Sequence, residues 1–288
     1  MTPPLVEKGV PIAVVAPCGI PDLARLDKGV QIARARGYDV QVVPELLAPY
    51  RYLAGDDEHR LVQLTAALES SEFGAVWIAR GGYGLTRILD RVDPAKVGAK
   101  PILGFSDVTA LFCRLHRHSE ARLIHGPVVH SLPITDQPSL EQVFARLEGR
   151  TDEEWAGESW VGGEATGWLC GGNLTLFASL CGTPWQVDAR GAIVLLEEIG
   201  EAPYRMDRLL TQLITAGFFD GVAGIGIGQL EGCAAPAGVD WDEHQVFVER
   251  LGGLGVPLVG KLPFGHGAVN QAFPWGARAT LRDGALRF

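Results

Sequence analysis

Hydrophobic residues in the first half of the chain follow two periods in turn. Short apolar runs of strand character occupy residues 10–16, 38–43 and 75–79, and another begins at Pro101. Between these runs, apolar residues recur every three or four positions, as they do over residues 23–33, which predicts helices. Strands that are apolar on both faces and alternate with helices are typical of a parallel sheet covered on two sides. The first half is therefore predicted to be an α/β domain.

The second half has shorter apolar runs and more frequent glycine turns. Only two helical repeats interrupt these runs, at residues 204–216 and 240–251, so we expect a smaller, mixed β-rich domain. The predicted strands are 164–169, 192–196, 223–228, 257–260, 278–281 and 285–288.

A helix and an acidic segment join the two halves. Ser139 and the glutamine three residues later have the spacing of a capping box, which predicts the start of an amphipathic helix. The acidic residues 151–158 that follow show no period, as is typical of a linker or a crossover. We therefore expect domains at 1–135 and 166–288, with the helix and the linker at 136–165.

Composition narrows the class of protein. A chain of 288 residues with 47% hydrophobic residues can bury a sizeable core, and its net charge of −9 argues against binding to duplex nucleic acid. The five cysteines are scattered without a C-x-x-C pair, as expected for reduced thiols in a cytoplasmic protein. No signal-peptide pattern is visible at the start, and no apolar run has the length of a membrane span. We expect a cytoplasmic protein with neither a nucleic-acid nor a membrane partner.

Ser106 lies where the hydrophobic period changes from that of a strand to that of a helix. A hydroxyl at such a corner projects from the carboxyl edge of the sheet, beside backbone N–H groups that can hold an oxyanion. It is also an ordinary position for a helix N-cap. The segment lacks the second glycine of the G-x-S-x-G elbow, so it does not indicate an α/β-hydrolase. Both interpretations of Ser106, as nucleophile and as cap, remain open at this point.

A serine nucleophile needs a base, and three histidines are candidates. His266 lies between two glycines directly after an apolar strand, where a loop can present an imidazole into a cleft. His125 and His130 flank a strand-like segment and are alternatives.

Two adjacent carboxylates, Glu197 and Glu198, end an apolar strand. Placing an anion there costs free energy unless the anion is paired, so at least one of them needs a dedicated partner. That partner is either a histidine, as in a catalytic site, or a downstream arginine, Arg205 or Arg208.

A glycine-rich turn at residues 80–84 follows the third predicted strand. It fails as a dinucleotide fingerprint because Arg87 stands at the third glycine position, and there is no Walker sequence. The turn indicates close backbone approach to another group. No metal-binding pattern is present, so we expect neither a metal nor a cofactor. Cys18 is a competing nucleophile, although a small buried side chain is the simpler interpretation.

Taken together, these motifs resemble the serine L,D-carboxypeptidases, the family of muramoyltetrapeptide carboxypeptidase and the microcin C immunity peptidase. Each motif is weak alone, but they run in the family's order over almost the whole chain. Cys18 departs from the serine common at its position. The matching segments are APCG at 16–19, RGGYG at 80–84, GFSDVTAL at 104–111, GGNL at 171–174, GTPW at 182–185, LEEIGEAPYR at 196–205 and FGH at 264–266.

The resemblance implies a Rossmann-like N-terminal domain with the nucleophile and a β-rich C-terminal domain with the other members of a Ser–His–Glu triad. Ser106 matches the nucleophile, Glu197 the acid and His266 the base. The site is then expected between the domains. We expect the backbone N–H groups of Asp107 and Gly82 to hold the oxyanion.

A carboxypeptidase also has to bind a terminal carboxylate, usually with an arginine. Arg80 and Arg205 are candidates by position, and pairing with a neighbouring glutamate is the alternative for each.

The expected activity is release of the C-terminal D-alanine from murein tetrapeptides during cytoplasmic peptidoglycan recycling. An alternative within the family is an amidase that acts on peptidyl- or aminoacyl-nucleotide antibiotics. An alternative of another class is a non-catalytic ligand-binding module that uses only the turn at residues 80–84. The resemblance also implies a homodimer with a small peptide substrate.

Overall fold

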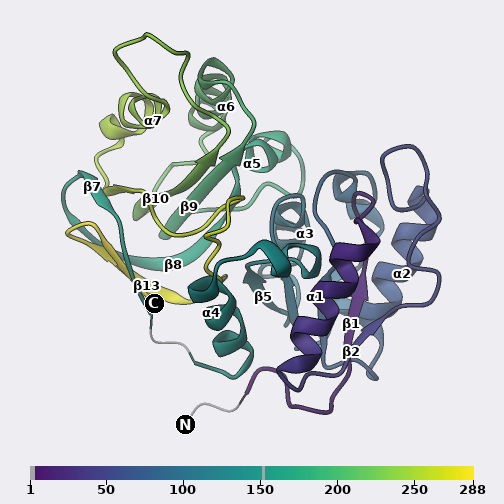
Figure 1. Ribbon diagram of the computed structural model, residues 1–288. Helices are drawn as coiled ribbons and strands as arrows, with labels where there is room; N and C mark the ends of the chain where they lie inside the picture. Colours follow the sequence, from purple (N-terminus) through teal and green to yellow (C-terminus); the bar gives the residue numbers. More distant parts are fainter. Residues whose placement is uncertain (1–3, 151–152) are drawn as a thin grey trace. The chain divides into compact units, whose positions relative to one another are not determined.

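The chain forms two compact units, Met1–Arg150 and Thr151–Phe288. The computed structural model describes residues 4–150 and 153–288 (Figure 1). Each unit contains its own β-sheet with helices packed against it.

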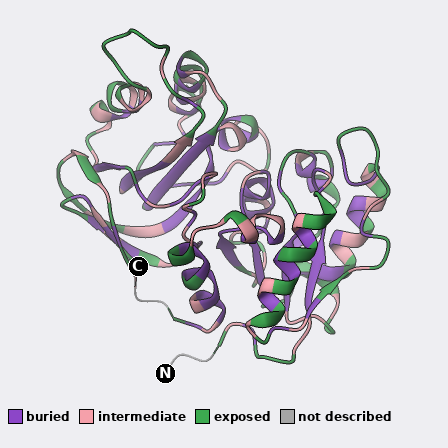
Figure 2. Ribbon diagram, in the orientation of Figure 1, coloured by how far each residue is buried: buried purple, intermediate pink, exposed green. Residues whose placement is uncertain are grey.

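The sheet of the first unit contains a run of five parallel strands in the order β5-β4-β3-β1-β2. Every residue of β1, β3 and β4 is buried, which confirms a parallel sheet covered on both faces. In Figure 2, β1 has the colour of buried residues. The strands are β1 (Ile12–Val15), β2 (Val40–Val42), β3 (Ala75–Ile78), β4 (Pro101–Gly104) and β5 (Arg122–His125).

The helices of the first unit follow the predicted repeats. They are α1 (Leu23–Ala35), α2 (Asp57–Glu69), α3 (Val108–Leu115) and α4 (Gln137–Leu147). Two 3₁₀ turns, η1 (Leu85–Arg87) and η2 (Leu89–Arg91), follow the glycine turn, and two further 3₁₀ segments are η3 (Pro94–Lys96) and η4 (Val129–Ile134).

The start of α4 differs from the prediction. Asp136, not Ser139, is the N-cap, and its carboxylate accepts the backbone N–H of Ser139 at 3.0 Å. Pro138 is compatible with the first turn because it lacks an N–H that would have no partner there. The helix therefore begins before Ser139, and the predicted capping box is wrong.

The sheet of the second unit has eight strands in the order β6-β14-β13-β8-β9-β10-β11-β7. Its centre, β8 to β11, is parallel, and the strands on either side are antiparallel, as expected for a mixed sheet. The strands are β6 (Glu154–Ala156), β7 (Glu158–Val161), β8 (Glu164–Asn173), β9 (Ala192–Ile199), β10 (Gly224–Glu231), β11 (Leu258–Gly260), β13 (Arg278–Arg282) and β14 (Ala285–Arg287), and a short strand β12 (Phe273–Pro274) lies outside this sheet.

Helix α6 of the second unit contacts both α5 and α7. The helices are α5 (Leu174–Leu180), α6 (Pro203–Thr215) and α7 (Glu243–Leu251), followed by the 3₁₀ turn η5 (Gly252–Leu254). Helix α5 is absent from the sequence-based expectations. In residues 4–150 and 153–288, no helix is both long and apolar enough to cross a bilayer.

The interval expected to be a helix and a linker, residues 136–165, contains more regular structure than its pattern indicated. Helix α4 belongs to the first unit. Residues 154–161 form strands β6 and β7, and residues 151 and 152 of the acidic segment lie outside the described residues. Trp155 is the buried residue of β6, between exposed neighbours, and its ring stacks on Phe264 at 5.8 Å between centroids. Strand β6 pairs with β14, and Trp155 is its one buried side chain, so the segment has too few apolar residues to show a period.

Candidate active site

Ser106 lies at a sharp corner between β4 and α3. Its φ is +66°, in the left-handed region that a side chain with a Cβ adopts at a cost. Helix α3 begins at Val108 with Asp107 at the N-cap position, so Ser106 precedes the cap and does not serve as one. The side chain is partly exposed, whereas Phe105 and Asp107 are buried. Backbone strain at a partly exposed serine that does not cap the helix favours the nucleophile interpretation over the cap interpretation.

The glycine turn after β3 lies directly against Ser106. A Cβ on Gly81 would stand 2.7 Å from the Ser106 Cβ and 3.0 Å from its Oγ, closer than a side chain tolerates. Gly82, with φ of +110°, continues the turn in a conformation that favours glycine. The backbone N–H of Gly19 donates to the Gly81 carbonyl at 3.1 Å. The close approach expected of this turn is thus an approach to the Ser106 side chain.

The carboxyl group of Asp107 points into the protein from the residue after Ser106. It is 1% exposed, and its Oδ2 accepts the backbone N–H of Leu85 at 2.9 Å. Burial raises the pKa of Asp107. Burial and the neighbouring Asp107 also raise the pKa of the fully buried Cys18 thiol. A buried, protonated thiol is a poor nucleophile, as expected of Cys18 acting as a small core residue.

In the second unit, the structure brings Glu197 and His266 together. Glu197, near the end of β9, is fully buried, and its Oε2 lies 2.5 Å from the Nδ1 of His266. Burial opposes a charge on the imidazole, but the attraction and hydrogen bond of Glu197, together with the charges of Glu198 and Glu231, outweigh it, so the pKa of His266 is raised. The carboxylate is placed to orient the imidazole ring through Nδ1.

Glu198 has a different role from that of its neighbour. Its Oε1 accepts from the Asn173 side chain and the Ile199 N–H, both at 2.8 Å. Its Oε2 accepts the N–H and the hydroxyl of Thr175, at 2.8 and 2.7 Å. Glu198 therefore holds the start of α5 against β9. Its pKa is raised by burial, an effect that these hydrogen bonds oppose.

The arginine alternative for these carboxylates is wrong for the residues that the structure describes. Arg205 lies 3.5 Å from Glu201 and contacts the Tyr204 ring, and Arg208 lies over the same ring. The partner of Glu197 is the histidine.

Two amide side chains hold the His266 loop and were not anticipated from the sequence. The Gln229 side-chain oxygen accepts the N–H of Gly267 at 3.0 Å, and Asn270 accepts that of Gly265 at 3.4 Å. Gly265 has φ of +144°, and a Cβ there would stand 2.8 Å from Gln229. The glycines on either side of His266 are the local signal for this loop, but its amide partners come from β10 and from further along the loop.

The two arginines expected to bind a carboxylate are exposed. Arg80 donates from Nη1 to the carbonyl of Ile20, and Arg205 is engaged by Glu201 and Tyr204. Of the alternative bases, His125 is fully buried at the end of β5, and burial lowers the pKa of His130. Across the described residues, there is no group of three or more histidine, cysteine, aspartate or glutamate side chains arranged to bind a metal ion.

Comparison with known proteins identifies both units. Residues 12–126 match the family model of the LD-carboxypeptidase N-terminal domain, and residues 166–281 match that of the LD-carboxypeptidase C-terminal domain. The murein tetrapeptide carboxypeptidase of Pseudomonas aeruginosa is 34% identical over 293 residues, covering 96% of this chain and 94% of the relative.

Solved structures show the same fold. Muramoyltetrapeptide carboxypeptidase from Oxalobacter formigenes superposes with a TM-score of 0.86 at 28% identity, covering 96% of this chain and 97% of the other. MccF in complex with glutamyl sulfamoyl guanosine gives a TM-score of 0.89 at 18% identity, with 100% and 98% coverage, a likeness of fold alone. On the sequence matches over both halves, the chain belongs to the LD-carboxypeptidase family of peptidases.

Proposed function

We propose that this protein is a serine carboxypeptidase that releases the C-terminal D-alanine of murein tetrapeptides by cutting an L-to-D peptide bond. The observation that carries the proposal is the buried hydrogen bond between Glu197 and His266, which is the acid–base half of a serine triad. The strained corner at Ser106 supports the same mechanism. The substrate class rests on the Pseudomonas aeruginosa relative, which is named a murein tetrapeptide carboxypeptidase.

The mechanism proceeds through an acyl-enzyme. His266 Nε2 takes the proton of the Ser106 hydroxyl as its Oγ attacks the carbonyl carbon before the terminal residue. Glu197 holds the Nδ1 proton and stabilises the imidazolium that forms. His266 then gives its proton to the leaving amine, and D-alanine departs. Water, deprotonated by the same imidazole, attacks the ester, releasing the shortened peptide and restoring the Ser106 hydroxyl.

Backbone N–H groups next to Ser106 would stabilise the oxyanion. We assign this role to the N–H of Asp107, at the start of α3, and to that of Gly82, in the turn that lies against Ser106. Donors of this kind stabilise charge that develops only in the transition state, so they raise kcat more than they lower KM. Arg80 and Arg205 are the proposed ligands of the terminal carboxylate. A homodimer in the cytoplasm remains the expected state of the enzyme.

Mass spectrometry of a muropeptide mixture tests the proposed substrate. Loss of one alanine from tetrapeptides supports the proposal. Cleavage of an aminoacyl-nucleotide conjugate, with tetrapeptides left intact, would assign the protein to antibiotic detoxification. No covalent change in either substrate would favour a non-catalytic ligand-binding module.

Labelling with a fluorophosphonate tests the nucleophile independently of the substrate. We expect one label per chain, at Ser106. Ser106→Ala should abolish labelling, whereas Ser159→Ala, which removes an exposed hydroxyl on β7, should leave it unchanged. Equal labelling of Ser106→Ala and the wild type would contradict the assignment.

A further inference from the structure

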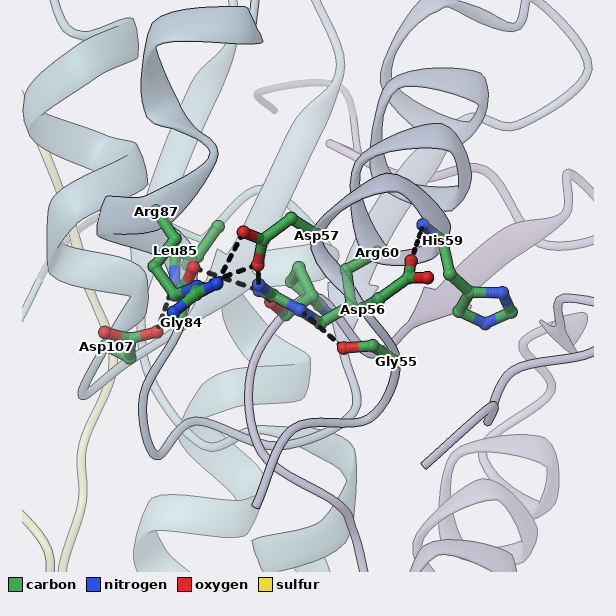
Figure 3. Close-up of polar contacts among 10 residues, drawn as sticks. Gly55, Asp56, Asp57, His59, Arg60, Gly84, Leu85, Arg87 and Asp107 are labelled. Atoms are coloured by element: carbon green, nitrogen blue, oxygen red, sulfur yellow. Dashed lines mark hydrogen bonds and ion pairs between the residues drawn. The ribbon is translucent and has the colours of Figure 1, made fainter. Parts of the chain in front are cut away.

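Arg60, on α2, is a fully buried arginine to which the mechanism above gives no role. Its guanidinium donates to three backbone carbonyls: Nε to Gly55 at 3.1 Å, and Nη1 to Pro17 at 2.5 Å and to Gly84 at 2.9 Å. Its Nη2 lies 2.5 Å from the carboxylate of Asp57 (Figure 3). Burying a cation is costly unless it is fully paired, so its presence here calls for an explanation.

The carbonyls that Arg60 binds belong to loops at one edge of the first sheet. Pro17 follows β1, and Gly84 ends the glycine turn that follows β3. A Cβ on Gly84 would stand 2.7 Å from the Arg60 Nη1, so the contact requires glycine at this position. One guanidinium group thus joins the loops that follow two neighbouring strands.

The peptide bond between Gly84 and Leu85 is held from both ends. Its carbonyl accepts from Arg60, and its N–H donates to Asp107 Oδ2 at 2.9 Å. We call this arrangement, Arg60, the Gly84–Leu85 peptide and Asp107, the peptide clamp (Figure 3). Asp107 is the residue after Ser106, so the clamp connects the end of the glycine turn to the corner that presents the serine.

We propose that Arg60 is a positioning residue for the Ser106 site. The proposal rests on the proposed function, because it takes Ser106 as the nucleophile and Gly82 as an oxyanion donor. The clamp fixes the end of the turn in which Gly81 packs against Ser106 and Gly82 presents its N–H. An oxyanion site works only when its donors are held in place before the reaction, so a small displacement of this turn reduces transition-state stabilisation.

Arg60 touches no position expected for substrate, so its effect should be confined to the chemical step. Without its guanidinium, the Gly84 carbonyl loses a charged donor and the turn can shift relative to Ser106. Acylation should then slow, whereas substrate affinity should change little. A purely structural arginine would change the melting temperature but leave the ratio of kcat to KM in the folded enzyme near that of the wild type.

Arg87 provides a matched control. It binds the same carboxylate, Asp57, through Nε at 2.8 Å and Nη2 at 2.7 Å, but it is 40% exposed. Arg87→Met therefore removes an ion pair of Asp57 and leaves the bonds from Arg60 to Gly84 and Pro17 in place.

The experiment compares Arg60→Met, Arg60→Lys and Arg87→Met with the wild type. Near-ultraviolet circular dichroism confirms folding, and the assays measure kcat, KM and the rate of fluorophosphonate labelling. We expect kcat and the labelling rate of Arg60→Met to fall about 100-fold, the loss typical of one oxyanion donor, with KM changed less than about threefold. In Arg60→Lys, which keeps the charge but lacks the planar guanidinium group with its several donors, kcat should remain at least about tenfold below that of the wild type. Arg87→Met should stay within about twofold of the wild type.

The outcomes separate this proposal from the proposed function. A wild-type enzyme that takes no label at Ser106 would refute the proposed function. Wild-type labelling together with an equally fast, folded Arg60→Met would overturn the positioning role alone. If Arg60→Met does not fold, Arg60→Lys decides: a folded enzyme with wild-type kcat overturns the proposal, and a slower one with unchanged KM supports it.

Discussion

Replacing Glu197 with glutamine tests the contact on which the mechanism depends. The fully buried Glu197 carboxylate lies 2.5 Å from His266 Nδ1, a geometry in which it accepts the ring N–H. Glutamine has nearly the same shape but no charge, and its amide group can donate to Nδ1. The ring would then carry its proton on Nε2, the atom proposed to accept the proton of Ser106.

The expected loss of kcat is large because the substitution changes the tautomer of His266 and also removes the negative charge beside it. The corresponding change of an aspartate to an asparagine in a serine-protease triad lowers kcat about 10⁴-fold, which corresponds to about 5 kcal/mol of transition-state stabilisation. The pKa of His266 should also fall, since Glu197 raises it against the effect of burial. In the wild type, His266 becomes neutral as the pH rises through its pKa, which lies above the ordinary 6.5, so activity should increase as the pH passes this raised pKa. In the Glu197→Gln variant, the acidic limb of the pH profile of kcat/KM should therefore move to lower pH.

The assay is the pH dependence of kcat/KM on a murein tetrapeptide, with Glu231→Gln as control. Glu231 is exposed and acts on His266 only through its charge, so that variant should keep activity within about threefold. A Glu197→Gln enzyme with wild-type kcat and an unmoved acid limb would refute the proposed role of the carboxylate.

Three further substitutions probe the nucleophile, the turn and the second carboxylate. Ser106→Ala should lower kcat on the tetrapeptide about 10⁶-fold, by analogy with subtilisin; near-full activity would refute the nucleophile. Gly81→Ala introduces a Cβ 2.7 Å from that of Ser106, so kcat should fall at least about tenfold in a folded enzyme, and an unchanged kcat would show that the turn can move away. Glu198→Ala leaves four hydrogen bonds unmade and should lower the free energy of unfolding, measured by urea titration, by about 3 kcal/mol; a change below about 1 kcal/mol would contradict its anchoring role.

Helices α1 and α2 of the first unit have 13 residues each, which is long enough for the hydrophobic period to be visible in the sequence. Helix α5 could not be found in this way. Its seven residues continue an apolar strand without a charged residue to mark one face. Asn173 caps α5 by accepting the N–H of Leu176 at 3.2 Å, and Glu198, on the neighbouring strand β9, accepts the N–H of Thr175. Such a contact between distant segments leaves no local signal.

In the candidate site, too, some features are predictable from the sequence and others depend on the folded structure. The change of period predicts the corner at Ser106, but a serine at φ of +66° could not be anticipated, since most residues avoid this region. The order of motifs indicated Glu197. What distinguishes it from Glu198 is the partner of each carboxylate in the folded protein: His266 for Glu197 and Asn173 for Glu198. Arg60 shows no signal at all, because an arginine in a helix is normally a surface residue.

The two adjacent glutamates of β9 make this strand sensitive to changes in length. Side chains alternate between the two faces of a strand, so Glu197 contacts His266 on one face and Glu198 binds Thr175, at the start of α5, on the other. A deletion or insertion of one residue before Glu197 would reverse these directions, aiming the wrong carboxylate at each partner and shifting the pairing of Glu197 with Asn173. The residue count along β9 therefore has to be preserved when this scaffold is redesigned.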